Sequence, residues 1–289
     1  MDRFEAAKKV SILGISGNIF LFIIKIIVGL ISNSQAMLAD AFNSASDVFN
    51  SLMTYIGNKV ASKSADADHN LGHGKAEYIY SMLISLTMIT VALRMLNSSF
   101  LSLFKTNEYH FSIWLIIVCL VTIVTKLGLY MYTKRIGQKS NNLLVEANSM
   151  DHRNDCIVTS FNMLSVILSL YGFTYGDSIV GIGISLWIMV TGLKIFKESY
   201  DILMDKTISS ETKDKVLKII EKYDDIIKIN HFNATPVGYR YQVTFSIFVD
   251  GNLSTFASHE IANRLEKEIA EKIPEIYLTV IHVNPAVKE

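Results

Sequence analysis

Two apolar stretches of the chain are interrupted by side chains that can bind a metal ion. The first, "AFNSASDVFNS", contains Asn43 and Asp47, and the second, "NSMDHRNDCIVTS", contains Asp151 and Asp155. In each stretch the two residues are four positions apart, which places them one turn apart on the same face of a helix. Two helices that pack with these faces together can surround a divalent cation with four oxygen ligands. The spacing therefore predicts a metal site formed by Asn43, Asp47, Asp151 and Asp155.

Polar side chains inside apolar segments need a partner other than lipid. A carboxylate at the centre of a bilayer costs about 2.5 to 3.5 kcal/mol on insertion scales, so we expect both polar faces to line the interior of a helix bundle. The simpler alternative is that these groups form hydrogen bonds between helices without binding an ion. Asp40, about one turn before Asn43, is a candidate for proton handling or helix packing. Lys25, Arg94 and Lys126 are expected to snorkel or to pair with a neighbouring helix.

A further cluster of potential ligands lies in "ADADHNLGHGKAE", which contains Asp66, His69 and His73. Two imidazoles and a carboxylate at this density suit Zn²⁺ or a similar borderline ion. The alternative is that the histidines are simply solvated in a loop. The metal-binding interpretation is better supported because an apolar segment with its own predicted metal ligands directly precedes this cluster.

The composition indicates a membrane protein. Half of the 289 residues are hydrophobic and 19% are charged, which is too apolar for a soluble domain of this length. The formal net charge is zero, so nothing suggests a nucleic-acid partner. A spanning helix needs about 20 apolar residues. Six segments meet this requirement, the second and fifth of them amphipathic, at roughly 10–32, 35–61, 78–101, 111–132, 145–171 and 177–196.

The distribution of basic residues predicts the orientation of these segments. Lys and Arg precede the first segment and follow the second, fourth and sixth, whereas the other connections almost lack them. The positive-inside rule therefore predicts an integral membrane protein with both termini in the cytoplasm. The two cysteines, Cys119 and Cys156, lie in apolar segments, so no disulfide framework is expected.

After residue 206 the composition becomes that of a soluble α+β domain. Ser209 or Ser210 is expected to cap a helix with apolar residues at a 3.6 period, and "YQVTFSIFV" alternates as a half-buried strand does. A strand from Ile226, a helix over 255–272 and a last strand, "YLTVIHV", complete the order α, β, β, α, β. We therefore predict a transport domain over 1–206 and a cytoplasmic domain over 207–289.

Four motifs occur in order along the chain: "LADAFNSASDVFNS", "DHNLGHGKAE", "MDHRNDCIVTS" and, in the tail, "ASHEIANRLE" with "VIHVNP". With them the chain resembles, over essentially its whole length, the cation diffusion facilitator family. The resemblance implies a homodimeric metal/proton antiporter with six transmembrane helices and a C-terminal cytoplasmic ferredoxin-like domain. It also implies that the transport site is formed by Asn43, Asp47, Asp151 and Asp155, and that a loop site is formed by Asp66, His69 and His73. It further implies an ionic contact between protomers through Lys75 and Asp205. In the C-terminal domain it implies three metal-binding histidines, His231, His259 and His282.

Departures from the family pattern bear on the choice of metal. Zinc-transporting members usually have His at the position of Asp151, whereas the quartet here is all oxygen, which suits Mn²⁺ and resembles the manganese-exporting branch. His152 points about 100° away from Asp151 on a regular helix, so we interpret it as a supporting or gating residue that can provide a nitrogen ligand if the helix rotates. In the tail, Phe245 and Asn284 stand where zinc-binding members present a His and an Asp, so a binuclear zinc site is not expected there.

The prediction from sequence is thus a proton-coupled exporter of divalent transition metal in a bacterial plasma membrane. Mn²⁺ is favoured over Zn²⁺, Fe²⁺ and Co²⁺, with a zinc, iron or cobalt/nickel exporter as the alternative; the metal is cargo, and no bound cofactor is expected. Neither "HExxH" nor a nucleophile with a plausible partner is present, so an enzyme is not expected. The alternative from a different class is a channel or a non-transporting metal sensor or receptor.

Overall fold

The computed structural model of the chain describes residues 3–31, 35–102, 113–169 and 176–286. Two units divide the chain: Met1–Ser62 with Ala76–Tyr200, and Lys63–Lys75 with Asp201–Glu289. The segment Lys63–Lys75 therefore belongs to the second unit, although its neighbours on both sides in the sequence belong to the first. The predicted boundary at residue 206 stays a prediction.

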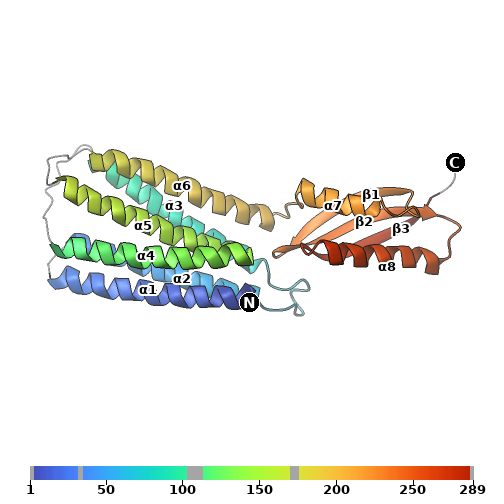
Figure 1. Cartoon of the computed structure of the whole chain (residues 1–289), viewed down its shortest axis with the longest axis horizontal. Coiled ribbons are helices and arrows are strands. Elements are labelled where there is room, and N and C mark those ends of the chain that lie inside the picture. The colour runs from blue at the N-terminus through green and yellow to red at the C-terminus, as the bar shows by residue number, and fades with distance from the viewer. Residues whose placement is uncertain (1–2, 32–34, 103–112, 170–175, 287–289) are drawn as a thin grey trace. The chain divides into compact units, whose positions relative to one another are not determined.

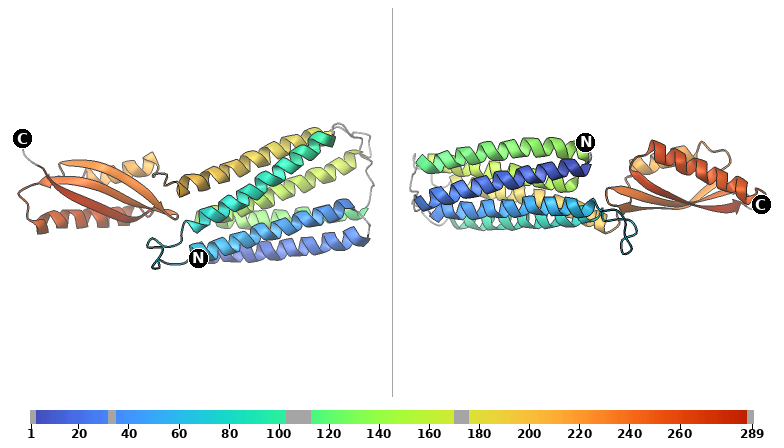
Figure 2. Two further views of the ribbon diagram at one scale, coloured as in Figure 1. Left: turned by 180° about the vertical axis from the view of Figure 1, so that it is seen from behind. Right: turned by 90° about the horizontal axis from the view of Figure 1, so that it is seen from below.

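Among the described residues, six long helices form the first unit. They run side by side in all three views (Figures 1 and 2). Each begins and ends within a few residues of a predicted apolar segment, except that α1 begins about two turns before its segment and α4 and α6 end about two turns after theirs. Their bounds are α1 Arg3–Ile31, α2 Gln35–Ala61, α3 Ala76–Ser102, α4 Ile113–Ser140, α5 Leu143–Ser169 and α6 Gly176–Leu203.

Three helices in the described part of the chain are long and apolar enough to cross a membrane. They are Arg3–Ile31, Ala76–Leu101 and Ile116–Ser140, which coincide with the first, third and fourth predicted spans. The helices α2 and α5 fall short because polar residues occupy one face of each, and these faces are buried at several positions. The number of six spans stays a prediction.

The helices α3 and α6 approach closely because glycine removes the side chain at their contact. A Cβ atom at Gly192 of α6 would lie 2.9 Å from the Ile89 side chain and 3.3 Å from the Ser85 carbonyl oxygen, both on α3. These distances leave no room for a larger residue without a shift. The two helices accordingly lie next to each other in Figure 2.

In the second unit, the described residues form a three-stranded sheet and two helices. Its elements are α7 Ser210–Ile220, β1 Lys228–Val237, β2 Arg240–Asp250, α8 Thr255–Lys272 and β3 Ile276–Ala286, in the predicted order α, β, β, α, β. The strand β2 is central, antiparallel to β1 and parallel to β3. Both helices cover the same face of the sheet (Figure 2).

The core of this unit follows from the predicted alternation in β2. Val243, Phe245, Ile247 and Val249 are buried and pack against apolar residues of both helices, including Leu265. Ser209 caps α7, because its side-chain oxygen accepts a hydrogen bond from the Thr212 backbone N–H at 3.1 Å. The choice between Ser209 and Ser210 is thereby settled in favour of Ser209.

Candidate metal-transport site

The polar faces of α2 and α5 lie against each other, as the i, i+4 spacing predicts. The Asn50 amide of α2 donates a hydrogen bond to Asp151 Oδ2 of α5 at 2.9 Å. One turn away, the Asn148 amide of α5 donates to the Thr54 hydroxyl of α2 at 2.7 Å. These two bonds fix the register of the helices and bring the carboxylates of both to a common interior.

Three carboxylates line a cavity of about 70 Å³ at this interface. Asp47 comes from α2, and Asp151 and Asp155 come from α5; Asp151 is 7% exposed. The side chains of the fourth predicted ligand, Asn43, and of Asp40 lie outside the described residues. The other polar residues that line the cavity come from α1 to α5 and are Lys25, Asn50, Thr87, Thr122, Lys126, Asn154 and Thr159.

Lys126 of α4 reaches the centre of this site. Its ammonium lies 2.7 Å from Asp47 Oδ2 and 2.5 Å from Asp155 Oδ2, and its side chain is only 1% exposed. The expectation that Lys126 pairs with a neighbouring helix is confirmed, but the sequence did not place it between two predicted metal ligands. Its signal was an ionisable residue in the middle of an apolar segment, which indicates an interior partner without naming it.

His152 lies closer to the carboxylates than a regular helix suggested. One of its ring nitrogens and the carboxylate oxygens of Asp151 and Asp155 all lie within 4.8 Å of one another. The side chain is fully buried, and within the described residues neither ring nitrogen has a hydrogen-bond partner. An unsatisfied buried donor costs about 1 to 3 kcal/mol, so a nitrogen here is available to a ligand.

Asn50 and Thr87 form a support that sequence reasoning missed. The Thr87 hydroxyl of α3 donates to the Asn50 side-chain oxygen at 2.8 Å, and Asn50 in turn donates to Asp151. Carboxylates that bind metals are commonly oriented by such hydrogen bonds. The position of Asn50, three residues after Asp47 on the same helical face, was the signal that could have revealed it.

The arrangement can hold a divalent cation. Three carboxylates outnumber the two ammonium groups, of Lys25 and Lys126, that line the cavity, and buried charge is tolerated only when it is paired. Carboxylate and amide oxygens are ligands for Mn²⁺ and Mg²⁺, whereas imidazole suits Zn²⁺. No nucleophile–base pair emerges among the residues of this cavity.

Comparison with known proteins identifies the fold. Residues 11–204 match the cation efflux transmembrane domain, and residues 208–286 match the cation efflux protein cytoplasmic domain. The chain belongs to the cation efflux family. It is therefore a membrane transporter of cations and not an enzyme, with a helical transmembrane domain followed by a cytoplasmic domain that contains strands.

Three relatives of this family cover nearly the whole chain. The manganese efflux system protein MneP of Bacillus subtilis is 26% identical, over 100% of this chain and 99% of the relative. The manganese efflux system protein MneS of the same organism is 28% identical, over 99% of both chains. The magnetosome protein MamM of Magnetospirillum gryphiswaldense is 28% identical, over 98% of this chain and 89% of the relative.

The loop between α2 and α3 of this cation efflux protein brings its three predicted ligands together. Asp66 Oδ1 lies 3.1 Å from His69 Nδ1, and Asp66 Oδ2 lies 3.3 Å from His73 Nε2. The His69 backbone N–H, which donates to the Asp66 carboxylate at 2.8 Å, lowers the pKa of that carboxyl. The Ser64 carbonyl oxygen lies 3.2 Å from His73 Nδ1, which leaves Nε2 facing Asp66. One ligand atom from each of the three residues lies within 4.8 Å of the others, which is close enough for a shared ion.

The remaining predicted positions lie in the second unit. Lys75 Nζ is 2.7 Å from Asp205 Oδ1 in the same chain, so this ion pair forms within one protomer; its exchange between protomers stays a prediction. His231, His259 and His282 are all exposed, and among the described residues none of them belongs to a group of three close ligands. Phe245, by contrast, is a core residue at 1% exposure.

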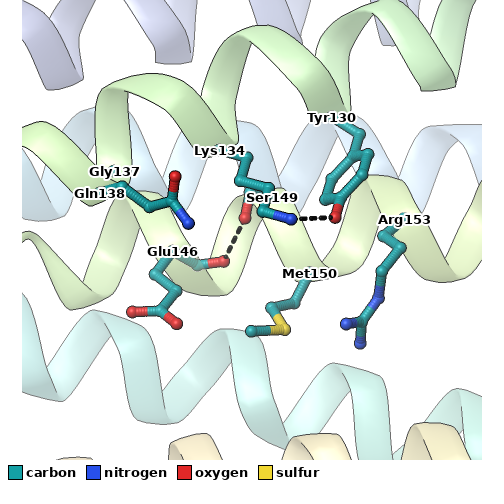
Figure 3. A pocket seen from close by; sticks show the side chains of 8 residues that line it. All are labelled: Tyr130, Lys134, Gly137, Gln138, Glu146, Ser149, Met150 and Arg153. Carbon is teal, nitrogen blue, oxygen red and sulfur yellow. Dashed lines mark hydrogen bonds between the residues drawn. The ribbon is translucent and has the colours of Figure 1, made fainter.

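A second cavity of the cation efflux domain, about 150 Å³ in volume, lies between α4 and α5 near the turn that joins them (Figure 3). Lys134, from α4, donates to the Tyr130 hydroxyl at 2.9 Å. Arg153, from α5, lies 4.3 Å from the centre of the Trp187 ring and donates to the Asn154 side-chain oxygen at 3.3 Å. Two basic side chains and the single carboxylate of Glu146 make this cavity unsuitable for a cation.

Proposed function

We propose that this protein exports a divalent transition metal in exchange for protons, with Mn²⁺ as the favoured cargo. The transport site consists of Asn43, Asp47, Asp151 and Asp155. The observation that carries the proposal is the meeting of three carboxylates from α2 and α5 at one buried cavity inside a helical unit. The two Bacillus relatives, which are named manganese efflux proteins, support Mn²⁺ over other cations.

The exchange of metal for protons follows from the charge of this cavity. Carboxylates crowded together repel, so the empty site gains from binding protons, and an arriving metal ion displaces them. If the helices rock so that the cavity opens alternately to each side, metal leaves on one side and protons enter from it. The two processes use the same oxygens, which couples them.

The cellular setting is proposed from the same features. We place the protein in a bacterial plasma membrane with six spans and both termini in the cytoplasm, because basic residues cluster at alternate ends of the helices. The cytoplasmic domain, with a ferredoxin-like arrangement, joins two protomers. The loop ligands Asp66, His69 and His73 form an auxiliary metal site, whereas His231, His259 and His282 belong to no such group among the described residues.

The decisive experiment is transport in proteoliposomes with Mn²⁺, Zn²⁺, Fe²⁺ and Co²⁺ offered in parallel, while metal flux and internal pH are recorded together. We expect Mn²⁺ flux with opposite proton movement, and its loss in Asp47→Ala, Asp151→Ala and Asp155→Ala, each of which removes a ligand. Wild-type flux in any two variants would contradict the proposed site. Metal flux without proton movement would indicate a channel, and binding without flux would indicate a sensor.

The loop has its own test. Replacing His69 and His73 with Ala together should slow transport or weaken the dimer while the order of preferred metals stays the same. A changed order would mean that selectivity resides in the loop and not in the cavity.

A second candidate cargo, Zn²⁺, is favoured by one observation: a ring nitrogen of His152 lies within 4.8 Å of a carboxylate oxygen of Asp151 and of Asp155. Imidazole raises affinity for Zn²⁺ more than for Mn²⁺. If His152 binds the cargo, His152→Ala should reduce Zn²⁺ flux much more than Mn²⁺ flux. An equal effect on both metals would leave His152 with a packing role.

A further inference from the structure

Lys126 occupies the position in which two predicted ligands would hold their metal ion. Its ammonium is within 2.7 Å of an oxygen of Asp47 and 2.5 Å of an oxygen of Asp155. These two carboxylates belong to different helices, α2 and α5, and Lys126 comes from a third, α4. The ammonium thus bridges the site in the way that a bound cation does.

A metal ion and this ammonium cannot share the two oxygens. Oxygen ligands lie about 2.0 to 2.1 Å from Mg²⁺ and about 2.3 to 2.6 Å from Ca²⁺, so an ion bound to the same pair would nearly coincide with Nζ. Two cations at such a separation repel strongly in a buried cavity. Metal binding at these two oxygens therefore requires Lys126 to leave.

Lys126 has the means to leave. Its charge sits on a flexible four-carbon stem. Thr122 lies one turn earlier on α4, lines the same cavity, and its buried hydroxyl has no hydrogen-bond partner among the described residues. This oxygen offers a hydrogen-bond acceptor for the displaced ammonium in the same cavity.

We propose that Lys126 is a tethered cation that exchanges places with the transported metal ion. The inference rests on the proposed function and deepens it. When no metal is present, the ammonium pairs with Asp47 and Asp155 alongside the protons that the empty site takes up; when metal binds, the ammonium moves away and the protons leave; when metal leaves, the ammonium returns. Lys126 weakens metal binding in this way, and by competing for the same oxygens it speeds metal release.

Lys126 also sets the charge that the site presents. Three carboxylates exceed the ammonium groups of Lys25 and Lys126 by one negative charge. Without Lys126 the excess would be two negative charges, and the site would hold a divalent ion more tightly. A merely structural lysine would support the helices but would not lower metal affinity, so the direction of the affinity change separates the two roles.

The test compares Lys126→Met, which keeps an unbranched side chain the length of the lysine stem and removes the charge, with Lys126→Arg, which keeps the charge. Lys134→Met, two turns along the same helix, serves as the matched control because its ammonium bonds to Tyr130 outside the carboxylate cavity. Mn²⁺ binding to the purified full chain is measured by calorimetry at pH 8, and the KM and Vmax of Mn²⁺ transport are measured in proteoliposomes.

We expect Lys126→Met to lower the Kd for Mn²⁺ about tenfold or more and to lower KM and Vmax together, because metal binds more tightly and leaves more slowly. Lys126→Arg should keep the wild-type Kd or raise it, since guanidinium binds carboxylates at least as well as ammonium. Lys134→Met should stay within about threefold of wild type. If Lys126→Met does not fold, a wild-type or raised Kd in Lys126→Arg supports the exchange, and a Kd lowered tenfold refutes it.

An unchanged or raised Kd in folded Lys126→Met, with transport lost, would overturn the inference and leave Lys126 as a structural support. That outcome leaves the proposed function intact as long as wild type transports Mn²⁺. Wild type that binds no divalent ion, or binds it equally after Asp47→Ala, would refute the proposed function and this inference together.

Discussion

Replacing Asn50 with Leu should weaken metal binding without removing a ligand. The side chain of Asn50 forms two hydrogen bonds: its NH₂ group donates to the Asp151 carboxylate at 2.9 Å, and its carbonyl oxygen accepts from the Thr87 hydroxyl at 2.8 Å. Leu has a similar shape but cannot form either bond, so Asp151 loses the contact that fixes its orientation. Hydrogen bonds to charged groups contribute about 1.5 to 3 kcal/mol, and supporting residues of metal sites commonly account for about 10- to 100-fold in affinity.

We therefore expect the Kd for Mn²⁺ to rise about 10- to 100-fold in Asn50→Leu. The assay is calorimetric titration of the purified protein with Mn²⁺, combined with thermal unfolding of the metal-free form. Thr54→Val is the matched control, because it removes the neighbouring bond between the same helices, 2.7 Å long, that does not involve a carboxylate.

Two outcomes would refute this reasoning. A wild-type Kd in Asn50→Leu would mean that Asp151 is not oriented by Asn50 or does not bind the ion. An equal rise in Kd for Thr54→Val would mean that the loss reflects general weakening of the contact between α2 and α5.

Three further predictions concern other contacts. Asp151→His brings a nitrogen donor to the cavity, so the ratio of Zn²⁺ to Mn²⁺ uptake in competitive vesicle assays should rise about tenfold, equivalent to about 1.4 kcal/mol; an unchanged ratio would contradict selectivity by oxygen ligands. Burial raises the pKa of Tyr223, whose hydroxyl donates to Glu268, from 10 to about 12. The protonated hydroxyl should therefore stabilise the cytoplasmic domain below pH 10, and this contribution should be lost as the pH rises toward 12. Chemical unfolding of this domain should show no such loss in Tyr223→Phe. Gly238→Ala should destabilise the cytoplasmic domain by about 1 to 2 kcal/mol, because Gly238 has a φ of 63° and a Cβ there would lie 2.9 Å from the Gly74 Cα. If the loop that contains Gly74 is cleaved by protease at the wild-type rate in this variant, the contact between Gly238 and Gly74 is dispensable.

The facing of α2 and α5 could be predicted because it depends on spacing within each helix. Asn43, Asp47, Asp151 and Asp155 fall on stripes of period 3.6, and stripes of polar residues in apolar helices must turn inward. The alternation in the central strand of the tail is local in the same sense. Patterns of this kind need no knowledge of the neighbouring element.

The position of Lys126 could not be predicted in the same way. Its helix is apolar all round, so no stripe indicates which side faces α2 or α5, and a lone lysine has many possible partners. The nearness of His152 to the carboxylates was missed for a related reason: the angle of 100° between successive residues gives the direction of the Cβ, not the reach of the ring. Both depend on how three helices meet, which single-helix periodicity does not contain. The predicted supporting or gating role of His152 stays a prediction.

The loop Lys63–Lys75 has a consequence for chimeric transporters. It belongs to the same unit as the tail, where Lys75 pairs with Asp205 and Gly74 packs on Gly238. A chimera that exchanges only the residues after α6 would place a relative's residues against this chain's own Lys75 and Gly74, so neither contact would keep both of its native partners. The second unit therefore cannot be exchanged as one continuous segment. It is formed by two separate parts of the sequence, Lys63–Lys75 and Asp201–Glu289, and an exchange that preserves its structure must transfer both.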